Sequence, residues 1–271
     1  MPVGTLNSRN RPFPVVLLLA AVIILTAPAE KVFAARTVCF DAFVNWDFHH
    51  RQKLEAWKVT AQVIQRTLDV WHLENPAHSL VENGSPDALR QFFSALPRED
   101  NCDISLVYLA SHQSPAGEWD FTQKKILSLN GILDEAEIPP HSGRIVILDT
   151  CFAAAVQRPE RWQKKFAPIF LFGSTASEKT PMVNFHTPQP VDFAHRYPAA
   201  FAWLKDCLGK KWDGKISFLG FVWVETFLAV KNPPLEMRSW IDFLQKCQST
   251  ANEFREHVSR RSSSEIILSV D

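Results

Sequence analysis

The sequence has little glycine, no excess of charge of either sign and only one long apolar run, and these scarcities exclude several classes of protein. Its 271 residues carry 29 basic and 29 acidic side chains, for a formal net charge of zero. A surface built throughout for nucleic acid needs a basic excess, so no nucleic-acid partner is expected. The nine glycines form no glycine-rich phosphate loop. With 46% apolar and 21% charged residues, the chain is not expected to be disordered.

The one long apolar run lies near the N-terminus, from Phe13 to Ala27. Arg9 and Arg11 precede it, and small residues follow it as far as Ala34. A positive start, a short apolar middle and an exit of small residues are typical of a secretory signal peptide. The run is short for a spanning helix. The sequence therefore predicts an exported chain, periplasmic or secreted, with no membrane contact unless the signal remains as an uncleaved anchor.

We expect three parts along the chain. Residues 1–35 are the signal peptide, 36–232 form one folded domain, and 233–271 form a C-terminal helix and tail that pack on the domain or extend it. Near-continuous apolar strands are predicted at 37–44, 103–110, 144–148 and 169–172. Helices are predicted at 49–72, 85–96, 199–208 and 236–259. Residues 76–84 are expected to form a loop, and the chain after 260 a mobile tail. This alternation predicts an α/β fold, a three-layer sandwich with a mostly parallel central sheet and helices on both faces.

Cysteine is also scarce, and export changes what five cysteines are expected to do. Thiols tend to pair in an oxidising compartment, but an odd number leaves at least one of them free. Cys39 lies in one predicted strand and Cys102 directly before another, so a bridge between neighbouring strands is one interpretation. Burial as separate small hydrophobic residues is the other. The sequence alone selects no pairing among Cys39, Cys102, Cys207 and Cys247.

Two residues that carry chemistry follow the ends of predicted strands. His112 comes directly after the strand at 103–110 and its terminal serine, and Cys151 comes shortly after the strand at 144–148. Ligand sites of parallel sheets lie beyond the carboxyl ends of the strands, so the imidazole and the thiol are expected at one edge. A nearby imidazole takes the proton of a thiol that attacks a carbonyl, and the backbone N–H groups of Gln113 and Cys151 are candidate donors for the oxyanion. The plainer interpretation is that Cys151 is a buried thiol and His112 a loop residue.

At these residues the sequence resembles the caspase-like cysteine peptidases, the superfamily that also contains metacaspases, legumains and gingipains. With its expected signal peptide, it resembles a bacterial-type exported member of that superfamily. Such enzymes have an apolar strand that ends in the catalytic His and a later one that ends in Asp-x-Cys or a relative. Here LVYLASH ends at His112 and RIVILDTC ends at Cys151, 39 residues later. The resemblance covers residues 37–228. It implies a caspase-like sandwich and a cysteine endopeptidase, with Cys151 as nucleophile, His112 as general acid and base, and neither metal nor cofactor.

Two departures from the family pattern leave other functions open. Gln113 stands where glycine usually follows the His, and Phe152-Ala153-Ala154 follows the Cys. One alternative is therefore a non-catalytic caspase-like binding module. Another is a transpeptidase, in which an amine rather than water accepts the acyl group of the same acyl-enzyme.

The resemblance also implies a substrate preference. Asp149, two residues before Cys151, matches the acidic residue that helps to line the S1 pocket of metacaspases and of gingipain- or legumain-like relatives. An acidic pocket favours a basic P1 side chain, so cleavage after Arg or Lys in a peptide or protein substrate is expected. Asp47 and Ser174 are further candidates for the pocket wall. Alternatively, Asp149 and Asp47 cap the turn or helix that follows each, and Ser174 is an ordinary loop residue. The oligomeric state is not predicted.

Overall fold

A computed structural model of the chain describes residues 37–46, 55–73, 78–114, 116–121, 125–150, 169–175, 182–184, 186, 192–258 and 265–270. The chain divides into Met1–Ala34 and Ala35–Asp271, and all described residues lie in the second part. The expected signal peptide therefore lies outside the described residues. For strands β7 and β10, only the backbone is described.

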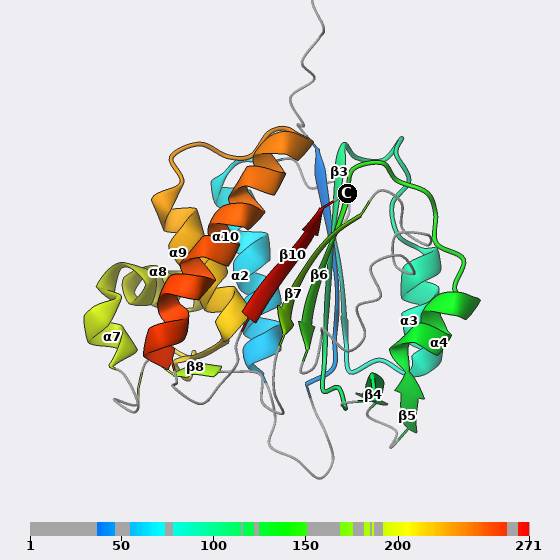
Figure 1. Cartoon of the computed structure of the whole chain (residues 1–271), viewed down its shortest axis with the longest axis horizontal. Helices are drawn as coiled ribbons and strands as arrows, with labels where there is room; N and C mark the ends of the chain where they lie inside the picture. Colours follow the sequence, from blue (N-terminus) through cyan, green and yellow to red (C-terminus); the bar gives the residue numbers. More distant parts are fainter. Residues whose placement is uncertain are drawn as a thin grey trace, which may run out of the picture. The chain divides into compact units, whose positions relative to one another are not determined.

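Six strands form one sheet in the order β10-β7-β6-β3-β1-β2 (Figure 1). Every neighbouring pair is parallel except β7 and β10, which are antiparallel. The strands are β1 Val38–Val44, β2 His78–Glu82, β3 Ile104–Ser111, β6 Arg144–Thr150, β7 Ile169–Thr175 and β10 Glu265–Val270. The central strands β1, β3 and β6 are buried along their whole length, which explains their near-continuous apolar sequences.

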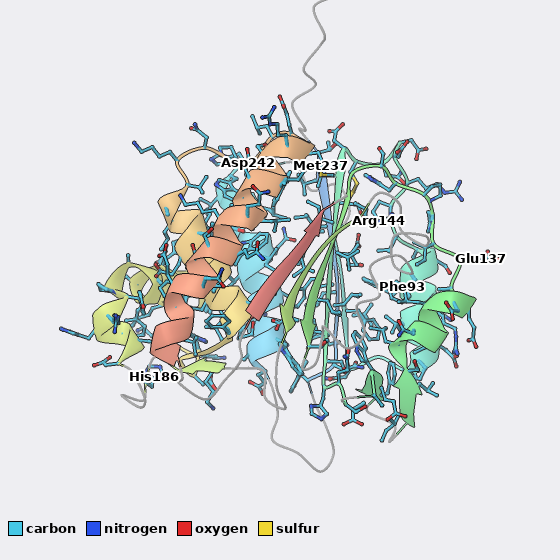
Figure 2. The ribbon with its side chains drawn as sticks, viewed as in Figure 1. Phe93, Glu137, Arg144, His186, Met237 and Asp242 are labelled. Carbon is cyan, nitrogen blue, oxygen red and sulfur yellow. A yellow bond between two sulfur atoms is a disulfide. The ribbon has the colours of Figure 1, made fainter. Side chains whose placement is uncertain are left out.

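Helices cover both faces of this sheet (Figure 1). One layer contains α2 Ala56–Val70, α7 Phe193–Arg196, α8 Pro198–Leu208, α9 Phe218–Ala229 and α10 Met237–Val258. The other contains α3 Pro86–Ser94 and α4 Leu129–Glu135. Alternate strand residues enter the two cores: Tyr108 packs with the α2 layer, whereas Val107 packs with α3 and α4. Phe93 lies in the α3 layer, on the opposite side of the sheet from His186 (Figure 2). The predicted α/β sandwich is confirmed.

Two short antiparallel strand pairs lie outside the main sheet. β4 Glu118–Phe121 pairs with β5 Lys125–Ser128, and β8 Met182–Asn184 pairs with β9 Lys215–Ser217. Helix α9 begins after Ser217, whose Oγ accepts a hydrogen bond of 3.1 Å from the N–H of Gly220. A Cβ atom at Gly220 would collide with the hydroxyl of Thr60 on α2, so the glycine lets α9 lie close to α2.

Two strands of the six-stranded sheet differ from the sequence-based expectation, and both are edge strands. β2 occupies part of the loop expected at 76–84, where Leu80 and Val81 pack against opposite cores while the strand pairs with β1. β10 occupies part of the expected C-terminal tail, where it adds to the sheet beside β7. Each strand is short and is stabilised by its neighbour in the sheet, so its own sequence carries a weak signal.

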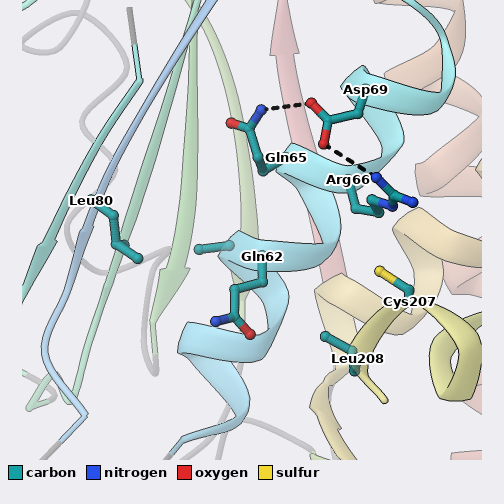
Figure 3. Close-up of a pocket in the computed structure, with 8 residues that line it drawn as sticks. Gln62, Gln65, Arg66, Asp69, Leu80, Cys207 and Leu208 are labelled. Atoms are coloured by element: carbon teal, nitrogen blue, oxygen red, sulfur yellow. Dashed lines mark hydrogen bonds and ion pairs between the residues drawn. The ribbon is translucent and has the colours of Figure 1, made fainter.

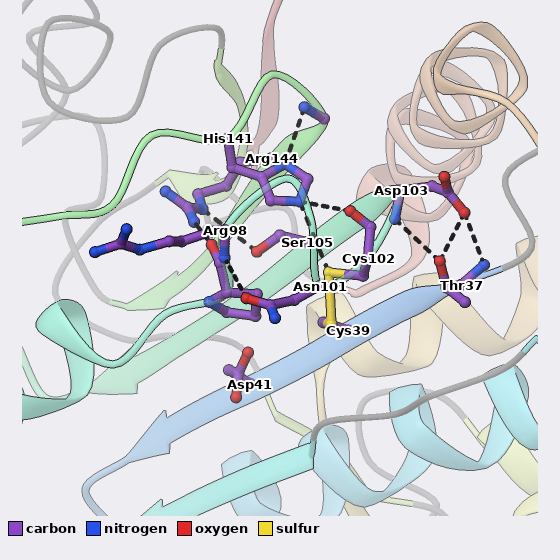
Figure 4. The surroundings of a disulfide bond; sticks show 12 residues. Thr37, Cys39, Asp41, Arg98, Asn101, Cys102, Asp103, Ser105, His141 and Arg144 are labelled. Atoms are coloured by element: carbon purple, nitrogen blue, oxygen red, sulfur yellow. Dashed lines mark hydrogen bonds between the residues drawn. A yellow bond between two sulfur atoms is a disulfide. The ribbon is translucent and has the colours of Figure 1, made fainter.

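A disulfide joins Cys39 of β1 to Cys102, just before β3, with the two Cα atoms 5.9 Å apart (Figure 4). The structure thus selects the bridge that the sequence left open. Cys207 and Cys247 are free thiols. None of the helices within the described stretches is long and apolar enough to cross a membrane.

Candidate active site at the carboxyl edge of the sheet

The candidate site begins where β3 and β6 end together. Their register runs from Ser105 opposite Arg144 to Ser111 opposite Thr150. The half-buried His112 comes directly after Ser111. Cys151 comes directly after Thr150 in the sequence, and its own placement lies outside the described residues. The two segments that deliver the candidate residues therefore leave adjacent parallel strands at the same edge.

The residues after β3 form a hairpin with β4, and this hairpin fixes the direction of one backbone donor. The N–H of Asp120 donates to the carbonyl of His112 at 3.1 Å, and the N–H of Ser114 donates to β4 at 2.9 Å. Gln113 lies between these two residues, at a non-hydrogen-bonded position of the antiparallel pair. Its N–H is consequently directed away from β4. This direction is compatible with the oxyanion role expected for it.

The side chain of Gln113 is buried and connects three segments. Its Oε1 accepts a hydrogen bond of 2.9 Å from Nε1 of Trp119 on β4 and another of 3.2 Å from Oγ1 of Thr150 on β6. All three side chains are 0% exposed. The backbone of Gln113 does not adopt a positive φ, so this position needs no glycine for conformational reasons.

Asp149 lies on the face of the sheet that is covered by α2 and α9, and it is fully buried. Its Oδ2 accepts hydrogen bonds from the hydroxyl of Tyr108 at 2.8 Å and from Oγ of Ser217 at 2.6 Å. Oγ1 of Thr60 lies 2.8 Å from the same Oγ of Ser217. Burial, followed by the nearby charge of Asp149, raises the pKa of Tyr108, so this phenol stays protonated and remains a donor.

The other two pocket candidates are less fully described. Asp47 lies outside the described residues. Ser174 belongs to the backbone of β7, and its side chain is not described. The last register pair of β6 and β7 is Leu148 opposite Gly173, so Asp149 and Ser174 are the next residues along adjacent strands.

Sequence reasoning missed the residues that hold these candidates in place. They are Tyr108, Thr150 and Ser217, and the contact of Trp119 with Gln113 was missed as well. Tyr108 shares a strand face with Ala110, but its contact with Asp149 depends on the register that sets Ala110 opposite Asp149, which only the structure shows. Among the residues that the structure describes, no cluster of three or more His, Cys, Asp or Glu side chains could hold a metal ion.

Two surface hollows lie beside α2, outside the contacts described above. The first is about 330 Å³ in volume, and in Figure 3 Gln65 and Arg66 both contact Asp69 in its wall, near Cys207. The second is about 260 Å³ and includes Trp46, the residue before Asp47. Neither hollow is lined by His112, Gln113 or Asp149.

No protein-family model matches the chain, and no curated protein matches it either. Solved structures do match. One is described as pro-sf-caspase-1, with a TM-score of 0.50, 11% identity and coverage of 90% of this chain and 95% of that one. Caspase-1 from Spodoptera frugiperda matches with a TM-score of 0.51, 8% identity and coverage of 88% of each chain. At such low identity the likeness concerns the fold alone, and this chain has a caspase-like α/β fold.

Proposed function

We propose that this chain is an exported cysteine endopeptidase in which Cys151 is the nucleophile and His112 the general acid and base. The observation that carries the proposal is the register of β3 and β6, whose last pair is Ser111 opposite Thr150. His112 and Cys151 are the next residue on each chain segment. Two adjacent parallel strands that end together supply a base and a thiol to one edge, as acyl transfer by a thiolate requires.

The backbone beside His112 supports an oxyanion role for Gln113. Its N–H is directed away from β4, because the hairpin hydrogen bonds use His112 and Ser114 instead. Together with the N–H of Cys151, it would stabilise the negative charge that develops on the attacked carbonyl oxygen.

We further propose that the substrate is a peptide or protein cleaved after Arg or Lys. Asp149 supports this preference, since it is an acidic side chain on the strand that leads to Cys151. The hydroxyls of Tyr108 and Ser217 donate to its Oδ2 and therefore favour the ionised carboxylate. An ionised carboxylate would attract a basic P1 side chain, which would have to reach Asp149 beneath α2 and α9, where the carboxylate is 0% exposed. Asp47 and Ser174 are proposed as further parts of the same pocket.

Export is proposed from the N-terminal sequence, and the disulfide supports it. A bond between Cys39 and Cys102 suits an oxidising compartment, whereas cytosolic reductants keep thiols reduced.

Peptide cleavage by the chain from Arg36 onwards tests the proposal. Fluorogenic peptides that differ only in P1, with Arg, Lys, Asn or Asp, are incubated with this chain and with its Cys151→Ala and His112→Ala variants. We expect cleavage after Arg or Lys that each variant abolishes while its circular dichroism spectrum is retained. Full activity in Cys151→Ala would exclude this nucleophile. Cleavage after another residue, if it still depends on Cys151 and His112, would support the catalytic dyad but exclude the role of Asp149 in the pocket.

A binding module without catalysis is the second candidate, and the buried side chain of Gln113 favours it, because a bulky residue occupies the usual glycine position. Alkylation separates the two functions. A thiol at Cys151 that reacts rapidly with iodoacetamide near neutral pH supports the peptidase. An unreactive thiol, together with no cleavage of any peptide, supports the module. Addition of an amine to an active preparation would reveal aminolysis products if the enzyme is instead a transpeptidase.

A further inference from the structure

The amide of Gln113 makes two hydrogen bonds whose chemistry determines its orientation. The indole Nε1 of Trp119 can only donate, so the amide atom that faces it at 2.9 Å is the oxygen. The hydroxyl of Thr150 approaches the same oxygen at 3.2 Å and donates to it as well. One carbonyl oxygen therefore accepts from two different strands.

The three side chains of this contact are shielded from solvent, so water does not compete for their hydrogen bonds. Gln113, Trp119 and Thr150 are all 0% exposed. Removal of the Gln113 oxygen would take this acceptor away from the buried Nε1–H of Trp119, and an unsatisfied buried donor costs more than the net gain from an ordinary hydrogen bond. The arrangement therefore holds the three segments in one relative position.

The three segments are the ones that matter for the proposed chemistry. Gln113 is the residue after His112, Thr150 is the residue before Cys151, and Trp119 lies on the β4 strand that pairs with the residues after β3. A shift of Gln113 relative to Thr150 would move the segment that carries His112 relative to the end of β6, from which the sequence continues to Cys151.

We propose that Gln113 is a positioning residue, whose side-chain oxygen holds the His112 loop against the end of β6 and so sets the imidazole relative to the Cys151 thiol. The inference rests on the proposed peptidase function. Glycine, usual at this position in the family that the sequence resembles, has no side chain to make this link. The departure at residue 113 thus supplies a contact that a glycine could not make.

Substitutions at Thr150 test the link with a matched pair. Thr150→Val keeps the shape of the side chain and removes the donor, whereas Thr150→Ser keeps the hydroxyl. Gln113→Met removes the acceptor at similar length, and Trp119→Phe removes the other donor if a variant at 113 or 150 fails to fold. Thr226→Val is the control, because the buried hydroxyl of Thr226 contacts Thr250, which is not part of the candidate site.

Two readouts distinguish positioning from simple destabilisation. For Gln113→Met and Thr150→Val we expect kcat to fall roughly 10- to 100-fold with little change in KM, the size of effect that a small misplacement of reacting groups produces. The pH profile of iodoacetamide alkylation at Cys151 should also shift towards that of an ordinary thiol. Thr150→Ser and Thr226→Val should retain the wild-type kcat and pH profile. The kcat of the double variant Gln113→Met/Thr150→Val should be no lower than that of Gln113→Met alone, since both changes remove the same contact.

The outcomes separate the two proposals. Wild-type kcat and pH profile in folded Gln113→Met and Thr150→Val would overturn the positioning role and leave the peptidase intact, provided that Cys151→Ala is inactive. An equal loss of kcat in Thr226→Val would also overturn the positioning role, because the effect would then follow stability. Activity in Cys151→Ala would overturn the proposed function itself.

Discussion

Tyr108 and Asp149 face each other diagonally across β3 and β6, with the phenol donating a hydrogen bond of 2.8 Å to Oδ2 of the carboxylate. Both side chains are fully buried on the face of the sheet that α2 and α9 cover. The strands that carry this pair are the same two strands that lead to His112 and Cys151. A change in the pair is therefore expected to affect both stability and the proposed choice of substrate.

Tyr108→Phe is expected to lower the free energy of unfolding by about 1–3 kcal/mol, because a buried charged acceptor loses one of its donors. Selectivity for Arg and Lys over neutral P1 residues should fall as well, since Asp149 is then held less firmly. Urea unfolding and the P1 peptide panel measure the two effects. Tyr197→Phe, at a partly buried tyrosine that is not part of the candidate site, is the control. An unchanged free energy of unfolding in Tyr108→Phe would show that the hydrogen bond to Asp149 does not stabilise the fold.

Much of this fold could be predicted from the sequence, because the buried strands are near-continuous apolar segments. β1, β3 and β6 are buried on both faces, so their sequences needed no partner to be recognised. β2 and β10 could not be recognised in this way. Each is an edge strand that depends on pairing with β1 or β7, and pairing between distant segments leaves little trace in a local pattern.

The candidate site was predictable to the extent that it follows from strand ends. The placement of His112 and Asp149 at one edge follows from the rule that parallel strands end together. The hydroxyl of Ser217 reaches Asp149 through the packing of α9, and the indole of Trp119 reaches Gln113 from β4, and no spacing in the sequence encodes either contact. In the sequence Gln113 is only a departure from the family pattern, and its two hydrogen bonds in the structure reveal what the side chain contacts.

Loss of the Cys39–Cys102 disulfide is expected to destabilise the fold. The bond closes a loop with a sequence separation of 63, and removal of a native disulfide from a small domain costs about 2–5 kcal/mol. Urea unfolding of the Cys39→Ser/Cys102→Ser variant measures the loss, and Cys207→Ser is the control, because Cys207 forms no disulfide. Equal midpoints for the double variant and the wild type would contradict a structural role for the bond.

His141 should make stability depend on pH. Its Nδ1 accepts from the N–H of Gly143 at 3.0 Å, so Nε2 carries the proton and donates to the carbonyl of Cys102 at 3.0 Å (Figure 4). Burial, and then the charge of Arg144, lowers the pKa of His141. The nearby Glu99 and Asp103 oppose this shift only in part.

The imidazole of His141 binds a second proton near pH 6.5 in the unfolded chain, but only at lower pH in the folded chain. Acidification below pH 6.5 therefore favours unfolding. The wild type should therefore lose stability between pH 7.5 and pH 5. The gap in free energy of unfolding between the wild type and His141→Gln should narrow over the same range, as urea unfolding at each pH would measure. A gap that stays constant or widens on acidification would contradict the lowered pKa.

Thiol labelling of the folded chain offers a direct test of Cys151, because the two other free thiols are poor nucleophiles. Burial raises the pKa of Cys207 to about 11 and that of Cys247 to about 12, so almost no thiolate forms at either near neutral pH. Brief treatment with iodoacetamide at pH 7, followed by peptide mass mapping, should therefore modify Cys151 almost exclusively. Cys207→Ser should label like the wild type, whereas Cys151→Ala should remain unlabelled until urea exposes the remaining thiols. Labelling at Cys207 or Cys247 as fast as at Cys151 would contradict the assignment of Cys151 as nucleophile, since a catalytic thiolate must react faster than thiols whose pKa is raised.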